Sequence, residues 1–148
     1  MKKQRLVILG STGSIGTQVL EVVRQHPNLF EIVALSANNN WKALSAQILE
    51  FNPETAVICN KDHYKNLQSE VSADTNILAG KEELIPLVQQ SNVDTVLNSL
   101  VGFSGFIPTV EALKAGKKVA LANKESLVVG GELINQIIKD GNGSLVPV

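Results

Sequence analysis

Short apolar runs alternate along this chain with longer segments in which apolar residues recur at helical spacing. The first run, residues 6–9, is apolar at every position, as expected of a strand that is covered by helices on both sides. The amphipathic segment that follows is expected to end near His26, because Pro27 disfavours helical geometry in the residue before it. The apolar stripe expected to face the core from this helix consists of Ile15, Val19, Val22 and Val23.

The same alternation continues through the 148 residues. Further strands are predicted at residues 32–35, 56–59, 76–78, 93–97, 118–122 and 145–148. Further helices are predicted at residues 41–51, 61–68, 81–90, 107–115 and 125–139. Strands that alternate with helices predict an α/β fold, in which a doubly wound, mostly parallel sheet carries helices on both faces. Neither a linker nor an internal repeat divides the sequence, so residues 1–148 are expected to form a single domain.

Three glycines separate the first predicted strand from the first predicted helix, in the segment GSTGSIG. In a Rossmann-like fold, Gly10 would allow a tight turn, Gly13 would let a pyrophosphate approach the backbone, and Gly16 would let the helix pack closely. The start of the helix offers free N–H groups and the positive end of the helix dipole, and Thr12 and Ser14 add hydroxyl donors. The segment therefore predicts a dinucleotide site, and the alternative is a glycine-rich turn without a ligand.

The end of the second predicted strand bears on which dinucleotide would bind. Sites for NAD usually carry an acidic residue there, about 20 residues beyond the glycines, which binds the ribose 2′-hydroxyl. This chain instead has Asn38, Asn39 and Asn40, and its next carboxylate is Glu50. Because a carboxylate would repel a 2′-phosphate, its absence permits NADP, and the asparagine amides can donate to phosphate oxygens. The alternative is a polar loop of turn-forming residues.

A third polar segment, Asn123-Lys124-Glu125, lies between an apolar strand and a helix in ALANKESLVVGGELI. Functional residues in parallel sheets collect at the carboxyl ends of strands, which favours a binding site here. The alternative is an ordinary helix start, with Asn123 as the N-cap and Glu125 favoured by the helix dipole.

Composition narrows the function classes. The chain is 44% hydrophobic and 18% charged, which is typical of a soluble globular domain. Its net charge of −1 gives no basic surface for nucleic acid, and no apolar run is long enough to span a membrane or form a signal peptide. The single cysteine, Cys59, excludes an internal disulfide, so a cytoplasmic location is expected. His26 and His63 lack partners at metal-ligand spacing, so no metal site is predicted in this chain.

Four segments in this order and spacing, GSTGSIG, NSLVGFSGFIPT, ALANKESLV and LVPV, resemble the 1-deoxy-D-xylulose 5-phosphate reductoisomerase family. The resemblance covers essentially the whole chain. It implies an N-terminal NADPH-binding domain, with the family's catalytic domain and C-terminal helical domain absent from this chain. It also implies that the full-length protein is a cytoplasmic homodimer that uses a divalent metal, Mg or Mn. That protein would convert a phosphosugar, 1-deoxy-D-xylulose 5-phosphate, to 2-C-methyl-D-erythritol 4-phosphate with NADPH, for isoprenoid precursors.

The resemblance also assigns residues. Thr12, Gly13, Ser14 and Ile15 match the loop that binds the pyrophosphate and adenosine half of NADPH, and Asn38–Asn40 match the loop near the 2′-phosphate. Many members have glycine followed by lysine or arginine where this chain has Asn38 and Asn39. Asn123 and Glu125 match positions that contact the cofactor, and Lys124 matches a lysine that contacts the substrate. The metal-binding carboxylates of the family follow the LVPV strand, so neither a metal ligand nor a catalytic group is assigned here.

The chain alone is therefore expected to bind NADPH without turnover. Two other functions remain open at this point. One is another NADP-dependent dehydrogenase such as a semialdehyde dehydrogenase. Those enzymes usually supply a catalytic cysteine further along the chain, and Cys59 lies too early for that role. The other is a standalone nucleotide-binding or sensing module.

Overall fold

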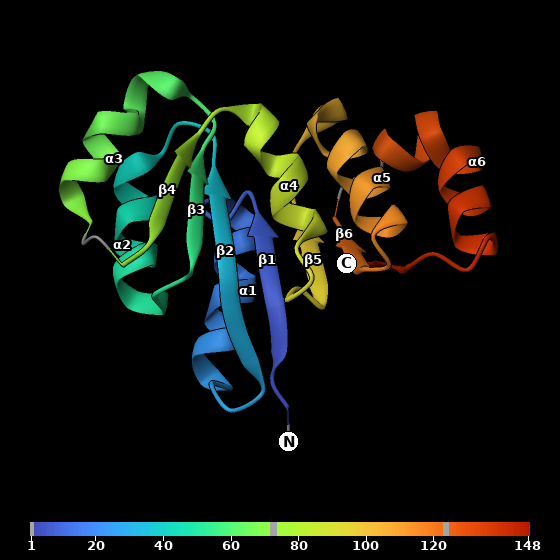
Figure 1. Cartoon of the computed structure of the whole chain (residues 1–148), viewed down its shortest axis with the longest axis horizontal. Coiled ribbons are helices and arrows are strands. Elements are labelled where there is room, and N and C mark those ends of the chain that lie inside the picture. Colours follow the sequence, from blue (N-terminus) through green and yellow to red (C-terminus); the bar gives the residue numbers. More distant parts are fainter. Residues whose placement is uncertain (1, 72–73, 123–124) are drawn as a thin grey trace.

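Parallel strands form one open sheet with helices on both faces (Figure 1). The computed structural model describes residues 2–71, 74–122 and 125–148. The strands are β1 (Gln4–Leu9), β2 (Phe30–Ala37), β3 (Thr55–Ile58), β4 (Asn76–Ala79), β5 (Thr95–Asn98), β6 (Lys118–Leu121) and β7 (Ser144–Pro147). The helices are α1 (Ser14–Gln25), α2 (Trp41–Phe51), α3 (Tyr64–Glu70), α4 (Leu84–Gln89), α5 (Phe106–Lys114) and α6 (Glu125–Lys139). Short 3-10 turns at Lys61–His63, Lys81–Glu83 and Gly102–Gly105 precede α3, α4 and α5.

The strand order is β4-β3-β2-β1-β5-β6-β7, and every strand pair within the described residues is parallel. The prediction of a doubly wound α/β sheet is confirmed, and the sheet is wholly rather than mostly parallel over these residues. The chain runs outward from β1 to β4 and then crosses back to place β5 on the other side of β1. The direction of winding thus reverses between β1 and β5, and such a reversal leaves a crevice at the carboxyl ends of the two strands.

Two apolar cores lie on opposite faces of this sheet. Because successive side chains of a strand point to opposite faces, β1 sends Leu6 and Ile8 into one core and Val7 and Leu9 into the other. Helices α1, α2 and α3 cover the first core, and α4, α5 and α6 cover the second. Each fully buried leucine or isoleucine contributes about 1.5–3 kcal/mol of hydrophobic stabilisation. No helix in the described part of the chain is both long and apolar enough to traverse a lipid bilayer.

One expectation about α1 was wrong. Val22 was assigned to the apolar stripe, but its side chain is 48% exposed. The buried residues of the helix are Gly16, Leu20 and Val23, while Ile15 and Val19 are only partly buried. The side chain of Gly16 is a single hydrogen, so the first turn packs directly on the preceding loop, and this contact fixes which face of the helix turns inward.

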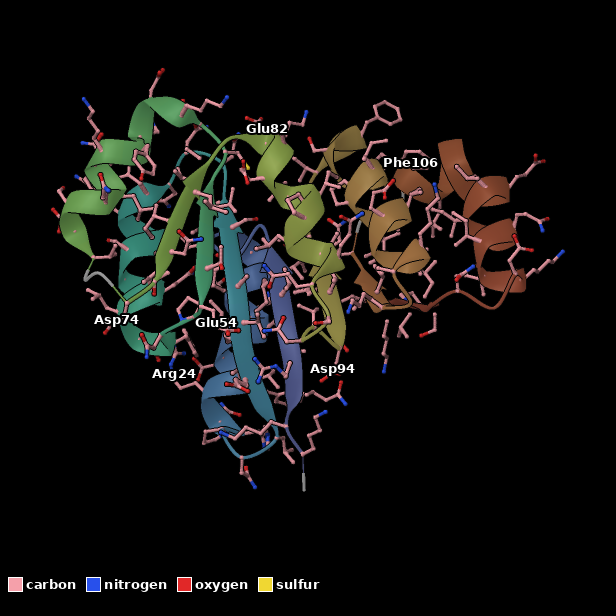
Figure 2. The ribbon with its side chains drawn as sticks, viewed as in Figure 1. Arg24, Glu54, Asp74, Glu82, Asp94 and Phe106 are labelled. Atoms are coloured by element: carbon pink, nitrogen blue, oxygen red, sulfur yellow. The ribbon has the colours of Figure 1, made fainter. Side chains whose placement is uncertain are left out.

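Polar residues at the amino end of the sheet form a network around Arg5. The Arg5 Nε donates to the carbonyl oxygen of Asn92 at 2.7 Å, and its guanidinium contacts Glu31 at 2.8 Å and Glu54 at 3.2 Å. Asp94 accepts from the Arg5 backbone N–H at 2.9 Å. Figure 2 labels Glu54 and Asp94 at this end, whereas Glu82 lies beyond the carboxyl ends of the strands. These contacts tie the start of β1 to its neighbours, far from the crevice.

Two adjacent glycines in α6 predict opposite responses to the same substitution. A Cβ at Gly130 would lie 1.8 Å from Cε1 of Phe106, whereas a Cβ at Gly131 would meet no heavy atom within 4 Å. Figure 2 shows Phe106 between α5 and α6. We expect Gly130→Ala to lower the free energy of unfolding by about 1–3 kcal/mol, because the ring must move. Gly131→Ala is expected to be neutral or to add up to about 1 kcal/mol, since alanine favours the helix. Urea denaturation of both variants measures the difference, and equal effects would contradict it.

Candidate functional site: a dinucleotide crevice

A crevice of about 180 Å³ lies at the carboxyl ends of β1, β5 and β6, where the winding direction reverses. Its lining consists of Ile15, Ser99, Leu100, Val101, Ala122 and Glu125. Ligands of open parallel sheets bind in such crevices. Two residues predicted from distant parts of the sequence, Ile15 and Glu125, are therefore brought to one site.

The glycine loop is fixed to the end of β2. Gly10 has φ of +78°, a left-handed conformation that glycine adopts without strain, and this turns the chain sharply out of β1. The N–H groups of Gly10 and Ser11 both donate to the carbonyl oxygen of Ser36, at 3.1 and 2.8 Å. The N–H of Gly13 donates back to the Gly10 carbonyl at 3.2 Å. The loop is therefore held in place by its own chain before any ligand arrives.

Ser11 and Gln47 make a paired contact that the sequence did not predict. The Ser11 hydroxyl donates to Oε1 of Gln47 at 2.7 Å, and Nε2 of Gln47 donates to the Ser11 carbonyl at 3.0 Å. Ser11 is completely buried. The contact joins the glycine loop to α2. Its only sequence signal is a glutamine in an amphipathic helix, and such a residue is usually solvent-exposed.

Removing the Gln47 side chain tests this contact. We expect Gln47→Ala to lower the free energy of unfolding by about 1–3 kcal/mol, because the buried Ser11 carbonyl loses its side-chain partner. Gln18→Ala, at an exposed position of α1, is the matched control and should change stability by less than about 0.5 kcal/mol. Chemical denaturation measures both variants, and equal effects would show that the Gln47 contact contributes nothing.

The three glycines of the loop differ in what surrounds them. A Cβ at Gly16 would lie 2.4 Å from the Gly10 carbonyl oxygen and 2.7 Å from Cα of Ser11, so this position excludes every other residue type. A Cβ at Gly13 would have only one neighbour, the Gly10 carbonyl oxygen at 3.6 Å, which is an ordinary contact. Gly13 is exposed and has φ of −80°, a conformation open to all residues. Nothing within the described residues requires glycine at this position, whereas a ligand lying against the backbone would.

Within the part of the chain that the structure describes, the N-terminus of α1 also lacks a side-chain cap. Gly13 is the N-cap residue, none of the described side chains accepts from the first turn, and that turn holds no acidic residue. Helix α2 differs, because Oδ1 of Asn40 accepts from the N–H of Ala43 at 3.1 Å. The positive end of α1 is therefore available to an anion, as expected for a phosphate site. Ser14 and Thr12 lie beside it, Ser14 exposed and Thr12 partly buried.

Side chains at the end of β5 close the other side of the crevice. Nδ2 of the fully buried Asn98 donates to the Gly105 carbonyl and to Oγ1 of Thr109, both at 2.8 Å. The Ser99 hydroxyl donates to the Leu9 carbonyl at 2.7 Å. Asn98 therefore anchors the segment that leads into α5, and Ser99 joins β5 to the end of β1. The sequence showed small and polar residues after a strand here but not these specific contacts.

The asparagine loop lies at the end of β2, the strand beside β1. Asn38, Asn39 and Asn40 are all exposed. Nζ of Lys42 lies 5.6 Å from the centroid of the Trp41 ring, at the start of α2. In Rossmann-like sheets this loop lies near the adenosine ribose. Two other predicted site residues, Asn123 and Lys124, lie outside the described residues.

Cys59, at the carboxyl end of β3, is partly buried and packs against the second core. Burial raises the pKa of its thiol, which keeps it protonated at neutral pH. A protonated thiol is a poor nucleophile, in agreement with the structural role expected from the sequence.

Comparison with known proteins decides the family. The sequence profile described as 1-deoxy-D-xylulose 5-phosphate reductoisomerase matches residues 6–131. The chain belongs to this family. A reductoisomerase of the family from Bacteroides fragilis (strain ATCC 25285) is 46% identical over 149 residues, which cover all of this chain and 38% of the relative. The chain thus spans well under half the length of that protein.

Solved structures of reductoisomerases have the same fold. The enzyme from Zymomonas mobilis in complex with NADPH superposes with a TM-score of 0.93 at 31% identity, over 99% of this chain and 39% of that one. A second DOX-P reductoisomerase, in complex with NADPH, fosmidomycin and magnesium, gives a TM-score of 0.91 at 41% identity. That match covers 97% of this chain and 36% of the other. The Rossmann-like fold expected from the glycine motif is confirmed.

Proposed function

We propose that residues 1–148 are the NADPH-binding domain of a 1-deoxy-D-xylulose 5-phosphate reductoisomerase. One observation carries the proposal. None of the described side chains caps the N-terminus of α1, and its N-cap residue, Gly13, is a glycine that packing among those residues does not require. Gly10 and Gly16 have intramolecular reasons to be glycine, whereas Gly13 has a reason only if a ligand lies against it. The relatives solved with NADPH supply the identity of that ligand.

The proposed contacts follow from the positions of the residues. Thr12, Gly13, Ser14 and Ile15 hold the pyrophosphate, because the free N–H groups of the first turn of α1 begin there. Asn38 and Asn40 lie beside the adenosine 2′-phosphate at the end of β2. Glu125 lies in the crevice near the nicotinamide half. The family resemblance adds Asn123 as a cofactor contact and Lys124 as a substrate contact.

NADPH, when bound, supplies the hydride that reduces the rearranged phosphosugar. The chain's own part is to bind the dinucleotide and present the nicotinamide at the crevice. The described residues contain no group of three or more histidine, cysteine, aspartate or glutamate side chains that would hold a metal. We assign the divalent metal, and the homodimer that the family resemblance implies, to the part of the family's polypeptide that this chain does not match.

Fluorescence of Trp41 tests cofactor binding. It is the only tryptophan in the chain and directly follows the asparagine loop. NADPH absorbs at tryptophan emission wavelengths, so bound NADPH should quench the fluorescence to a plateau, and excess NADP⁺ should restore it by displacement. Quenching that grows without saturation and does not respond to NADP⁺ would contradict the proposal.

The chain alone should not turn over substrate. With 1-deoxy-D-xylulose 5-phosphate, Mg²⁺ and NADPH present, we expect no decrease in the near-ultraviolet absorbance of NADPH, because the described residues provide no metal site. A steady decrease that scales with the concentration of the purified chain would refute this expectation.

A further inference from the structure

We propose that Asn60 is a positioning residue for recognition of the 2′-phosphate, acting through Asn39. This inference rests on the proposed NADPH-binding function and adds to it a residue from a different strand connection. Asn60 follows β3, whereas the asparagine loop follows β2. The two strands are neighbours in the sheet, so their carboxyl ends lie side by side.

A series of hydrogen bonds links the two segments. The backbone N–H of Asp62 donates to Oδ1 of Asn60 at 3.0 Å. Nδ2 of Asn60 then donates to Oδ1 of Asn39 at 2.8 Å. The backbones are also joined, because the N–H of Asn60 donates to the carbonyl oxygen of Asn38 at 2.9 Å. Asn60 thus holds both the path of the loop and the orientation of one of its side chains.

The direction of this series is chemically fixed. A backbone N–H can only donate, so the amide oxygen of Asn60 must face Asp62 and its NH₂ group must face Asn39. Asn39 accordingly turns its own amide oxygen toward Asn60. This leaves the NH₂ group of Asn39 as the end that can meet a ligand. A donor suits a phosphate, whereas the opposite orientation would present an acceptor oxygen and repel it.

Neighbouring side chains also favour recognition of the phosphate by amide donors. Oδ1 of Asn40 accepts from the N–H of Ala43, so its NH₂ group is likewise the free end of the amide. Nζ of Lys61, the cation beside Asn60, contacts Glu82 at 2.8 Å. The oriented amides of Asn39 and Asn40 therefore offer hydrogen-bond donors at the end of β2, while Lys61 is paired with Glu82. Loss of the Asn60 amide should weaken binding of NADPH while leaving binding of NADH unchanged.

The test is the ratio of dissociation constants for NADPH and NADH, measured by calorimetry on the full chain. For Asn60→Ala we expect the Kd for NADPH to rise about tenfold and that for NADH to change less than about twofold. Asn60→Asp is the second variant, since its carboxylate still accepts from Asp62 but cannot donate to Asn39. It should raise the Kd for NADPH further. Asn66→Ala, at an exposed position of α3, is the matched control and should leave the ratio unchanged.

A double substitution shows whether Asn60 acts through Asn39. In the background of Asn39→Ala, the change Asn60→Ala should leave the ratio unaltered, because the side chain that it orients is gone. A ratio that is unaffected by Asn60→Ala in the original chain, or equal losses for both cofactors, would overturn the inference while leaving the NADPH site intact. Failure of the unsubstituted chain to bind either cofactor would overturn the proposed function and this inference together.

Discussion

Replacing Gly16 with alanine is expected to lower the free energy of unfolding by about 3 kcal/mol and to abolish measurable NADPH binding. The new Cβ would lie 2.4 Å from the Gly10 carbonyl oxygen, with Cα and the carbonyl carbon of Ser11 at 2.7 and 2.8 Å. These are backbone atoms of a loop that is tied to Ser36, so they cannot move aside as a flexible side chain would. The first turn of α1 must shift instead, and this displaces the N–H groups proposed to hold the pyrophosphate.

Urea denaturation and calorimetric titration with NADPH measure the two effects. Gly131→Ala is the control for the glycine-to-alanine substitution itself, since its Cβ would meet no heavy atom within 4 Å. The expected loss of about 3 kcal/mol for Gly16→Ala is large when set against the 5–15 kcal/mol that typically stabilises a domain. If Gly16→Ala matched Gly131→Ala in stability, the close approach of α1 to the glycine loop would be refuted.

Gly13→Asp is expected to change stability and binding in opposite directions. Gly13 is the N-cap of α1 and already has the extended backbone that a capping side chain needs. Aspartate there would accept from the first turn and favour the helix dipole, adding about 0.5–1 kcal/mol to the free energy of unfolding. The same carboxylate would occupy the place of the pyrophosphate and repel it. We expect the affinity for NADPH to fall at least about 100-fold, which corresponds to about 2.7 kcal/mol.

Gly13→Asn separates charge from capping, because asparagine caps the helix equally well without a charge. Without the charge–dipole interaction it should add only a few tenths of a kcal/mol to the free energy of unfolding, and it should cause a smaller loss of affinity. If Gly13→Asp bound NADPH as tightly as the unsubstituted chain, the proposed pyrophosphate site would be refuted. The anion would then lie elsewhere.

Much of the fold was predictable because strands buried on both faces differ plainly from amphipathic helices. Helices at residues 41–51 and 125–139 were predicted with the bounds that the structure shows, but the kink at Gly130 within the second was not. The strand, three spaced glycines and helix also predicted the turn that leads into the crevice, whereas a dinucleotide bound there remains a proposal. The prediction failed on which face of α1 turns inward. Val22 and Leu20 are both apolar, but Leu20 is buried and Val22 is exposed, and the close packing at Gly16 favours this rotation.

The supporting contacts of the site could not be predicted in the same way. Ser11 and Gln47 are 36 residues apart, and Asn39 and Asn60 are 21 apart. Asn39 and Asn60 meet because the neighbouring strands β2 and β3 end together, whereas Gln47 contacts Ser11 from within α2. Residue type alone does not reveal such pairs. Asn40 shows a related difficulty, since the residue predicted to read the 2′-phosphate also caps α2 through its amide oxygen.

The most direct test of the central claim is an NMR titration of the chain with NADPH, followed through assigned backbone amides. The account predicts saturable shifts centred on residues 13–16, where the pyrophosphate would lie, and on residues 38–41, near the 2′-phosphate. Titration with NADH should reproduce the shifts at residues 13–16. Most of the shifts at residues 38–41 should be absent, because NADH has no 2′-phosphate. Shifts confined to another hollow, such as the cavity of about 490 Å³ that includes Tyr64 and Asn76 in its lining, would contradict the account. So would a folded chain whose spectrum does not respond to NADPH at all.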